Sequence, residues 1–221
     1  MYKKMIALSL IGTLLIGASF IFREGQFSTP ALKDSFTRNF ILQDEQAPEG
    51  FHLFKSKIDT YTMLFPSDFQ LVSNPPEFYG RQGNFFELWI ADLENSSKGA
   101  KKMVNLKGTF RLLGKGNVEK ELEILKSERD RTKYYETYEN EGNIIFLEKV
   151  VKNYDSIQKK MVLGDPNKQE ANNYYGFVAN KKTNQSLELV YSINCKDNCS
   201  IDVEKELIFM KTLLESVEFN N

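Results

Sequence analysis

Hydrophobic and polar residues alternate along much of the chain beyond residue 51. The clearest case is the segment 103–113, where Val104, Leu106, Phe110 and Leu112 are expected to point inwards and the residues between them outwards. A period of two with one apolar and one polar side predicts a strand of an antiparallel sheet with one buried face. The same period predicts strands over 60–65, 84–93, 133–138, 143–151, 154–163, 172–180 and 186–193.

Two further strands have a defined apolar side, and short polar connections predict two hairpins. The apolar side consists of Tyr61, Met63 and Phe65 in the first strand and of Phe86, Leu88 and Ile90 in the second. The connection "ENEG" supplies Gly142, a residue that adopts turn conformations without a steric penalty. The connection "KKTNQ" (181–185) predicts the second hairpin.

Two helices are predicted among these strands. The segment 116–133 begins with Asn117 as N-cap and has a narrow apolar stripe of Val118, Leu122 and Leu125. A C-terminal helix is predicted to begin at Ser200 and to lead into a short strand in "ESVEF". Its apolar stripe consists of Val203, Leu207, Met210, Leu214 and Val217, widened by Ile208. The order of elements predicts an α+β domain with helices packed on an antiparallel sheet.

The N-terminus is different in character. Lys3 and Lys4 precede 18 uncharged, mostly apolar residues (5–22), which predict an apolar helix and either a signal peptide or a membrane anchor with the N-terminus inside. Such a helix is roughly 27 Å long, close to the thickness of a bilayer core of about 30 Å. Both outcomes place the folded domain outside the cytoplasm, at the cell membrane or secreted.

The segment "LLIGASF" (14–20) resembles a processing site. Gly17 and Ser19 fit cleavage before Phe20, whereas the continuing apolar residues up to Phe22 favour an uncleaved anchor. The residues before Ser19 also resemble the end of a bacterial lipobox, in which a cysteine would follow. Without a thiol at that position, no thioether to a lipid can form. We therefore predict an export segment or anchor over 1–22, a tether over 23–50 with a short helix around 31–42, and one α+β domain over 51–221.

The segments "YTMLFPSDFQLV" (61–72) and "SVEF" (216–219) resemble the first and last strands of PsbP-type domains, whose fold is shared with Mog-type Ran-binding proteins. The order of elements over 51–219 is similar too. The resemblance implies a PsbP-like α+β fold and a role as an accessory or binding subunit. It transfers no functional residue, because the charged determinants of Ran binding are not recognisable.

Charge gives no reason to expect a nucleic-acid partner. The formal net charge is -1, and charged residues make up 27% of the chain with both signs interspersed. Nucleic-acid-binding domains usually carry a basic patch or stripe. The membrane is expected to be contacted through the N-terminal segment.

The two cysteines, Cys195 and Cys199, are predicted to form a disulfide that fixes a turn, as is usual in an oxidising compartment. Free thiols and a metal or redox site are the alternatives. A structural zinc site needs four ligands, and the only histidine, His52, is far away in sequence. We expect no metal and no cofactor.

The sequence favours a non-catalytic protein whose partner, a protein or an envelope component, is unknown. A single histidine and the absence of nucleophile and phosphate-binding motifs argue against histidine-dependent catalysis. Aromatic residues and an arginine concentrate in 73–89, and such residues often anchor interfaces. The predicted interaction surface consists of Phe78, Tyr79, Arg81, Phe85 and Trp89.

Two alternatives remain. One is a carboxylate-dependent envelope hydrolase, for which two acids about 5–10 Å apart would suffice. The acids concentrated in one region are Asp68, Glu77, Glu87, Asp92 and Glu94. The other is a small-ligand carrier with an apolar pocket between helix and sheet.

Overall fold

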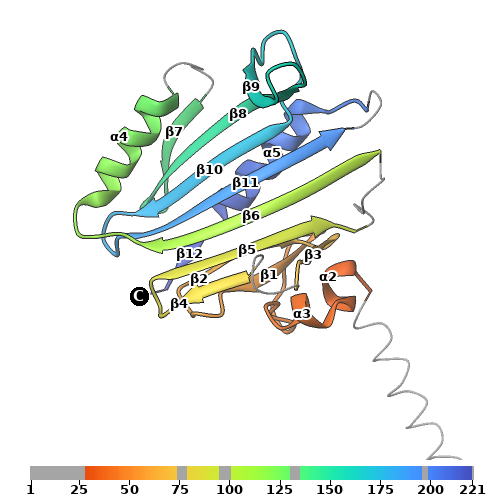
Figure 1. Cartoon of the computed structure of the whole chain (residues 1–221). Helices are drawn as coiled ribbons and strands as arrows, with labels where there is room; N and C mark the ends of the chain where they lie inside the picture. Colours follow the sequence, from red (N-terminus) through yellow and green to blue (C-terminus); the bar gives the residue numbers. More distant parts are fainter. Residues whose placement is uncertain (1–27, 74–78, 95–100, 130–134, 196–198, 221) are drawn as a thin grey trace, which may run out of the picture.

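Most of the chain forms two antiparallel sheets, one large and one small (Figure 1). The structure is a computed structural model, and it describes residues 28–73, 79–94, 101–129, 135–195 and 199–220. The large sheet has the strand order β3-β5-β6-β11-β10-β8-β7, with β4 paired to β5 and β9 paired to β8, and the small sheet has the order β1-β2-β12.

The strands of the large sheet are β3 (Phe69–Leu71), β4 (Tyr79–Gln82), β5 (Phe86–Leu93), β6 (Lys102–Leu112), β7 (Tyr135–Asn140), β8 (Asn143–Asp155), β9 (Lys160–Gly164), β10 (Asn173–Asn180) and β11 (Gln185–Cys195). Those of the small sheet are β1 (Phe51–Lys55), β2 (Tyr61–Pro66) and β12 (Glu218–Phe219). The helices are α2 (Pro30–Lys33), α3 (Ser35–Arg38), α4 (Asn117–Arg129) and α5 (Val203–Glu215).

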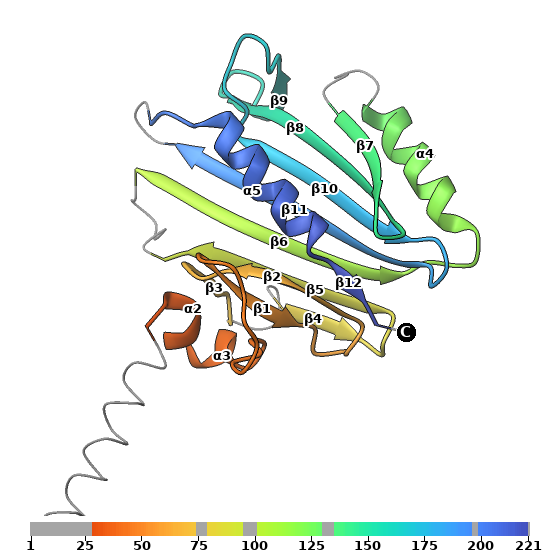
Figure 2. The same cartoon turned by 180° about the vertical axis from the view of Figure 1, so that it is seen from behind.

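The large sheet is covered on both faces, but unequally (Figures 1 and 2). One face packs against α5 and the small sheet and forms the main core. On the other face α4 covers a smaller cluster through Val118, Leu122 and Leu125, the stripe predicted from the sequence. The predicted α+β class, with helices on a large antiparallel sheet, is confirmed for the described residues.

Several predicted elements differ in detail. The buried side of β5 is Glu87, Trp89 and Ala91, not the predicted side with Phe86, Leu88 and Ile90, which stays partly exposed. The predicted alternation is correct, but the buried side contains the carboxylate of Glu87, and a charged residue is normally assigned to the exposed side. In β6, Leu112 is exposed because the strand runs past the edge of the core.

The C-terminal helix also differs from its prediction. Its N-cap is Asp202, whose side chain accepts a hydrogen bond from Lys205 N, rather than Ser200. Ile208 is exposed and lies outside the buried stripe, whereas Met210 and Leu214 are fully buried.

Residues 30–41, predicted as part of a tether, belong to the folded domain. They form α2 and α3, and Ala31, Phe40 and Ile41 are buried in the main core. Ala31 N donates to Ser67 O at 3.0 Å, which holds the segment against the connection between β2 and β3. Among the described residues no helix is both long and apolar enough to cross a membrane, and the predicted apolar helix of 5–22 lies outside them.

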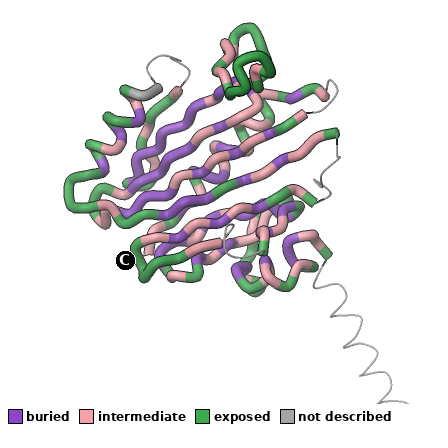
Figure 3. The backbone as a smooth tube through the Cα atoms, viewed as in Figure 1, coloured by how far each residue is buried: buried purple, intermediate pink, exposed green. Residues whose placement is uncertain are grey.

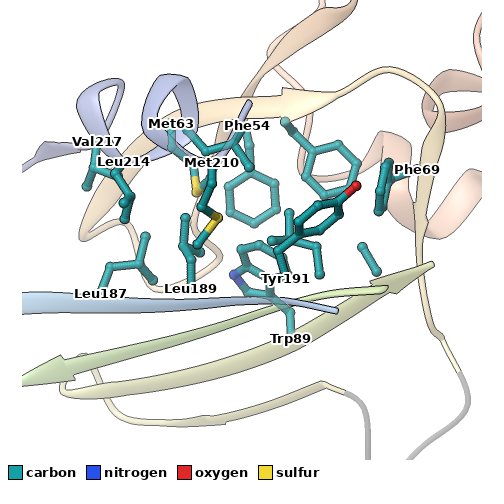
Figure 4. Close-up of a cluster of buried hydrophobic side chains, with 14 of the residues drawn as sticks. Phe54, Met63, Phe69, Trp89, Leu187, Leu189, Tyr191, Met210, Leu214 and Val217 are labelled. Carbon is teal, nitrogen blue, oxygen red and sulfur yellow. The ribbon is translucent and has the colours of Figure 1, made fainter. Parts of the chain in front are cut away.

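Two glycines of the large sheet, Gly108 on β6 and Gly176 on β10, leave room for core side chains to pack against the backbone. A methyl group at Gly108 would meet the Trp89 indole ring at 2.3 Å, and one at Gly176 would meet Leu214 at 2.6 Å. Figure 4 shows Trp89 below Phe54 and Met210 within the same cluster of side chains. Trp89 is fully buried, so its ring has nowhere to move.

Gly108→Ala is therefore expected to lower the free energy of unfolding by about 1–3 kcal/mol, because an added methyl group overpacks a rigid aromatic contact. The matched control is Gly80→Ala, on β4, where nothing lies within 4 Å of the new methyl group. The control should change stability by no more than about 0.5 kcal/mol. Urea unfolding of both variants measures the difference, and equal values for the two would contradict the packing described.

The only histidine allows a second test. His52 lies on β1 and its Nε2 is 2.7 Å from Thr29 Oγ1, and partial burial lowers the pKa of His52 below 6.5. A lowered pKa means that the unfolded chain binds the proton more readily than the folded chain. Stability is then fully present above about pH 6.5 and decreases as the pH falls towards the folded pKa.

The titration of the single imidazole resonance by NMR should give a midpoint below that of a histidine in an unfolded peptide. In His52→Gln, the corresponding pH dependence of unfolding should disappear. A midpoint at or above 6.5 would show that the imidazole is not desolvated by the α2–β1 contact.

Candidate functional site

The interaction surface predicted from the sequence is divided in the structure. Trp89 lies in the core, which corrects its assignment as a surface anchor, and Phe78 lies outside the described residues. Tyr79 is half-buried and packs edge-on against Phe36 and Phe40 of the α3 region. Only Arg81 and Phe85 remain exposed among the described members of the set.

Tyr79 and Trp89 belong to a buried network around Glu87. The Glu87 carboxylate accepts hydrogen bonds from Tyr61 Oη at 3.0 Å, Tyr79 Oη at 3.1 Å and Lys57 N at 2.9 Å. Trp89 Nε1 in turn donates to Tyr61 Oη at 2.7 Å. Burial, and next the charge of Glu87, raise the pKa of Tyr61 and of Tyr79 far above the usual value, so both hydroxyls remain donors.

This network has a structural role. Glu87 is fully buried and its two oxygens are occupied by three donors, so the carboxylate does not face solvent or a substrate. The space between α5 and the sheet, where a ligand carrier would need a pocket, is filled by buried side chains (Figure 4). Two surface depressions, of about 570 and about 240 Å³, lie along the segment 39–45 instead.

A different part of the molecule exposes a group of large apolar side chains. We call it the hairpin surface, and it consists of Tyr154, Ile157, Met161 and Leu163 on the β8–β9 hairpin. These side chains are 58–92% exposed. The hairpin is the teal element labelled β9 in Figure 1, and its exposed backbone is green at the top of Figure 3. Large apolar groups that gather on the surface of a soluble domain commonly mark an interaction site.

Strand register brings these side chains together. Tyr154 pairs with Met161, and Lys152 pairs with Leu163. Directly paired residues point to the same face of an antiparallel ladder, and residues two apart share a face. Tyr154, Met161 and Leu163 therefore line one face of the hairpin, together with the aliphatic part of Lys152.

The turn of the hairpin places Ile157 at its tip. Asp155 Oδ1 accepts hydrogen bonds from Ile157 N and Gln158 N, both at 2.9 Å, which is an Asx-type turn. Lys159 adopts a φ of 50°, in the left-handed region. The turn thus uses the only carboxylate of the segment 151–164 for local backbone contacts, and Ile157 is 92% exposed.

The base of the hairpin is fixed to the large sheet. Asn172 bonds both backbone groups of Lys152, accepting from its N at 2.8 Å and donating to its O at 2.9 Å. Gly164 is needed nearby, because a methyl group there would lie 2.6 Å from Val151 and from Gln169. The exposed residues therefore lie on a regular antiparallel ladder whose base is fixed by hydrogen bonds, rather than on an irregular loop.

The hairpin is also positively charged. The segment 151–164 contains three lysines, Lys152, Lys159 and Lys160, and one acid, Asp155. It therefore carries a formal charge of +2 in a chain with a net charge of -1. Lys159 and Lys160 are exposed, and no ion pair among the described residues includes them. The hairpin surface thus combines apolar side chains with lysines.

The hairpin and the start of the folded domain lie at the same end of the large sheet. One row of paired residues crosses six strands: Gln70, Asp92, Asn105, Ser192, Asn173 and Val150. At one edge Gln70 Nε2 donates to Pro30 O at 3.1 Å, and at the other edge β8 continues past Val150 into the hairpin. We call this the proximal end; it is the right-hand side of the sheet in Figure 1.

The opposite, distal end carries a smaller apolar group. Phe85 and Leu112 are each 45% exposed, and Leu112 N donates to Phe85 O at 2.9 Å. Phe85 and Arg81 are what remains exposed of the surface predicted from the sequence, and Leu112 was not part of that prediction. The two exposed groups are therefore at opposite ends of the same sheet.

The cysteines lie at the proximal end too. Cys195 and Cys199, for which the sequence predicts a disulfide, are joined across a Cα–Cα distance of 5.5 Å. Among the described residues no group of three or more histidine, cysteine or acidic side chains is placed to hold a metal ion.

The sequence did not reveal the hairpin surface. The segment 154–163 was predicted as one strand, but β8 runs through Asp155 and turns, so that Met161 and Leu163 belong to the returning strand. The signal for a turn was Asp155 followed by Ser156, residues that commonly begin turns. Nothing in the local pattern shows that the apolar face would lack a covering element.

Comparison with known proteins places the chain in a family. The family model described as "Putative lipoprotein YvcA", of the YvcA/Mog1p type, matches residues 27–218. The "Putative lipoprotein YvcA" of Bacillus subtilis (strain 168) is 22% identical over 198 residues, which cover 86% of this chain and 76% of that protein. No solved structure matches the chain significantly. The PsbP/Mog-type resemblance seen in the sequence is confirmed, and the chain belongs to the YvcA/Mog1p family.

Proposed function

We propose that this protein is a membrane-anchored, extracytoplasmic binding protein without catalytic activity, which engages an envelope component through the hairpin surface. The observation that carries the proposal is the group of four large apolar side chains, 58–92% exposed, on a hairpin whose base is fixed by hydrogen bonds. A soluble domain gains nothing from such a group unless another surface covers it.

The location rests on three observations. The relative is named a lipoprotein, the N-terminal segment 5–22 is apolar behind two lysines, and the cysteines form a disulfide. Both cysteines lie near the C-terminus, and Ser19 stands where a lipobox would have its cysteine. This chain is thus anchored by the apolar segment itself, where a lipoprotein is held by its acyl chains. Release of the domain by cleavage before Phe20 is the competing outcome.

The two alternatives have less support. A carboxylate-dependent hydrolase needs two accessible acids, and Glu87 is buried and fully hydrogen-bonded. A ligand carrier needs an apolar pocket under α5, where Met210 and Leu214 are fully buried. The Arg81–Phe85 surface at the distal end is a second candidate for binding, and one measurement distinguishes it from the hairpin surface.

That measurement is hydroxyl-radical footprinting of the full-length protein in its native membranes, compared with the purified protein. We expect Tyr154 and Met161 to be protected in membranes, and Phe85 and Leu112 to react equally in both samples. Protection at Phe85 and Leu112 instead would transfer the binding role to the distal end. No protection at either end would contradict a binding role for both surfaces.

The mode of anchoring is tested by Ser19→Cys, which completes the lipobox. In a bacterial host, this variant should incorporate a fatty-acid label and become sensitive to an inhibitor of lipoprotein signal peptidase. The wild type and the matched control Ser19→Ala should do neither and should stay in the membrane fraction with an intact N-terminus. A wild-type protein that begins at Phe20, or one that incorporates the label, contradicts the proposed anchor.

A further inference from the structure

We infer that the hairpin surface binds the lipid surface of the membrane in which the protein is anchored, with a preference for anionic lipids. This inference rests on the proposed function and names the envelope component as the bilayer itself. Three features of the described residues carry it: the composition of the hairpin, its position relative to the start of the domain, and its reach.

The composition is that of an interfacial membrane contact. Ile157, Met161 and Leu163 offer aliphatic and thioether groups, and Tyr154 adds an aromatic ring with a polar tip, which suits the headgroup region. The neighbouring lysines are able to extend their ammonium groups towards phosphates while the apolar side chains enter the acyl boundary. Binding of this kind strengthens with buried apolar area and with the attraction of cations to anionic lipids.

The position of the hairpin brings it towards the membrane. The apolar segment ends at Phe22 and the fold begins at Pro30, so the bilayer lies within eight residues, about 28 Å, of the proximal end. Five inter-strand steps separate Gln70, beside Pro30 on β3, from Val150, at the base of the hairpin on β8. At about 4.8 Å between strands, the two points are about 24 Å apart along the same end of the sheet.

Past the shared row, β8 is also longer than β11. From the shared row, β8 continues for five residues, from Val150 to Asp155, whereas β11 continues for three, to Cys195. At about 3.3 Å per residue the hairpin extends about 17 Å and the neighbouring strand about 10 Å. A domain with its proximal end turned towards a bilayer would therefore present Ile157, at the tip of the hairpin, on that side of the sheet.

The charge argues against a second copy of this chain as the occupant. Two hairpins that faced each other would bring together two segments of +2 each, with their only acids already bound in the turns. Like charges at close range oppose association, whereas an anionic bilayer neutralises them. The same sign of charge that disfavours pairing of hairpins thus favours lipid.

The test uses the full-length protein reconstituted alone into nanodiscs that contain either phosphatidylcholine or a mixture with phosphatidylglycerol. Footprinting should show a several-fold lower oxidation of Met161 and Tyr154 in the anionic discs than in phosphatidylcholine discs. Phe85 and Leu112, an equally apolar pair at the distal end, should be unaffected. These residues serve as internal controls, because they are on the same molecule.

Two variants identify the contributions. Ile157→Ser should reduce the protection in both kinds of disc, and Lys159→Gln combined with Lys160→Gln should reduce only the additional protection by anionic lipid. Leu112→Ser is the matched control and should leave the protection of Met161 unchanged. All four positions are exposed, so unchanged unfolding curves are expected and establish that each variant is folded.

The outcomes separate the two proposals. Protection in native membranes but not in nanodiscs would overturn the lipid inference and leave the binding function, with a protein as partner. Protection that appears only in discs with two copies of the chain would overturn the lipid inference in favour of self-association. No protection in either setting would overturn both.

Discussion

The buried carboxylate of Glu87 joins the two sheets, and the rest of the fold depends on that connection. Glu87 belongs to β5 of the large sheet, whereas Tyr61 belongs to β2 of the small sheet and Lys57 to the connection between β1 and β2. A buried charge is costly unless donors surround it, so the small sheet must stay in place for β5 to remain where it is. Trp89, two residues on, fills the space above Gly108 and donates to Tyr61, and so ties the aromatic core to the same point.

This constraint explains how far sequence reasoning could go. Periodicity predicted β2, β5, β6, β7, β8, β10 and β11, both hairpins around Gly142 and 181–185, and the α4 stripe, because each depends on local backbone geometry and on one apolar side. It chose the wrong side of β5, because Glu87 breaks the rule that charged residues face water, and its three donors come from residues 8 to 30 positions away. The same long-range pairing made Trp89 a core residue rather than a surface anchor. Residues 30–41 were predicted as part of a tether for a related reason, since partners such as Ser67, in the connection between β2 and β3, lie far away in the sequence.

The hairpin surface was hidden from the sequence for the opposite reason. Met161 and Leu163 look like core residues, and an alternating pattern says that a face is apolar, not that something covers it. Whether that face is covered depends on where α4 and α5 pack. Among the described residues, the core clusters to which these helices contribute do not include the side chains of the hairpin surface. Asn172 and Gly164 show that the hairpin is nevertheless a specified part of the fold, because each fits a close backbone contact at its base.

An anchored domain needs only a weak contact to fix its orientation. Fully burying a side chain such as Ile157 is worth about 1.5–3 kcal/mol, and four partly exposed groups together would give several kcal/mol. About 4 kcal/mol corresponds to a dissociation constant near 1 mM, too weak to bring a free protein to a membrane. A short tether, however, gives an effective concentration in the millimolar range, so the same contact would be occupied for much of the time. In this protein the apolar N-terminal segment would then supply attachment, and the hairpin would determine which face of the sheet is turned towards the envelope. A lipid at residue 19 would give the same attachment but not the orientation, which only a second contact such as the hairpin would provide.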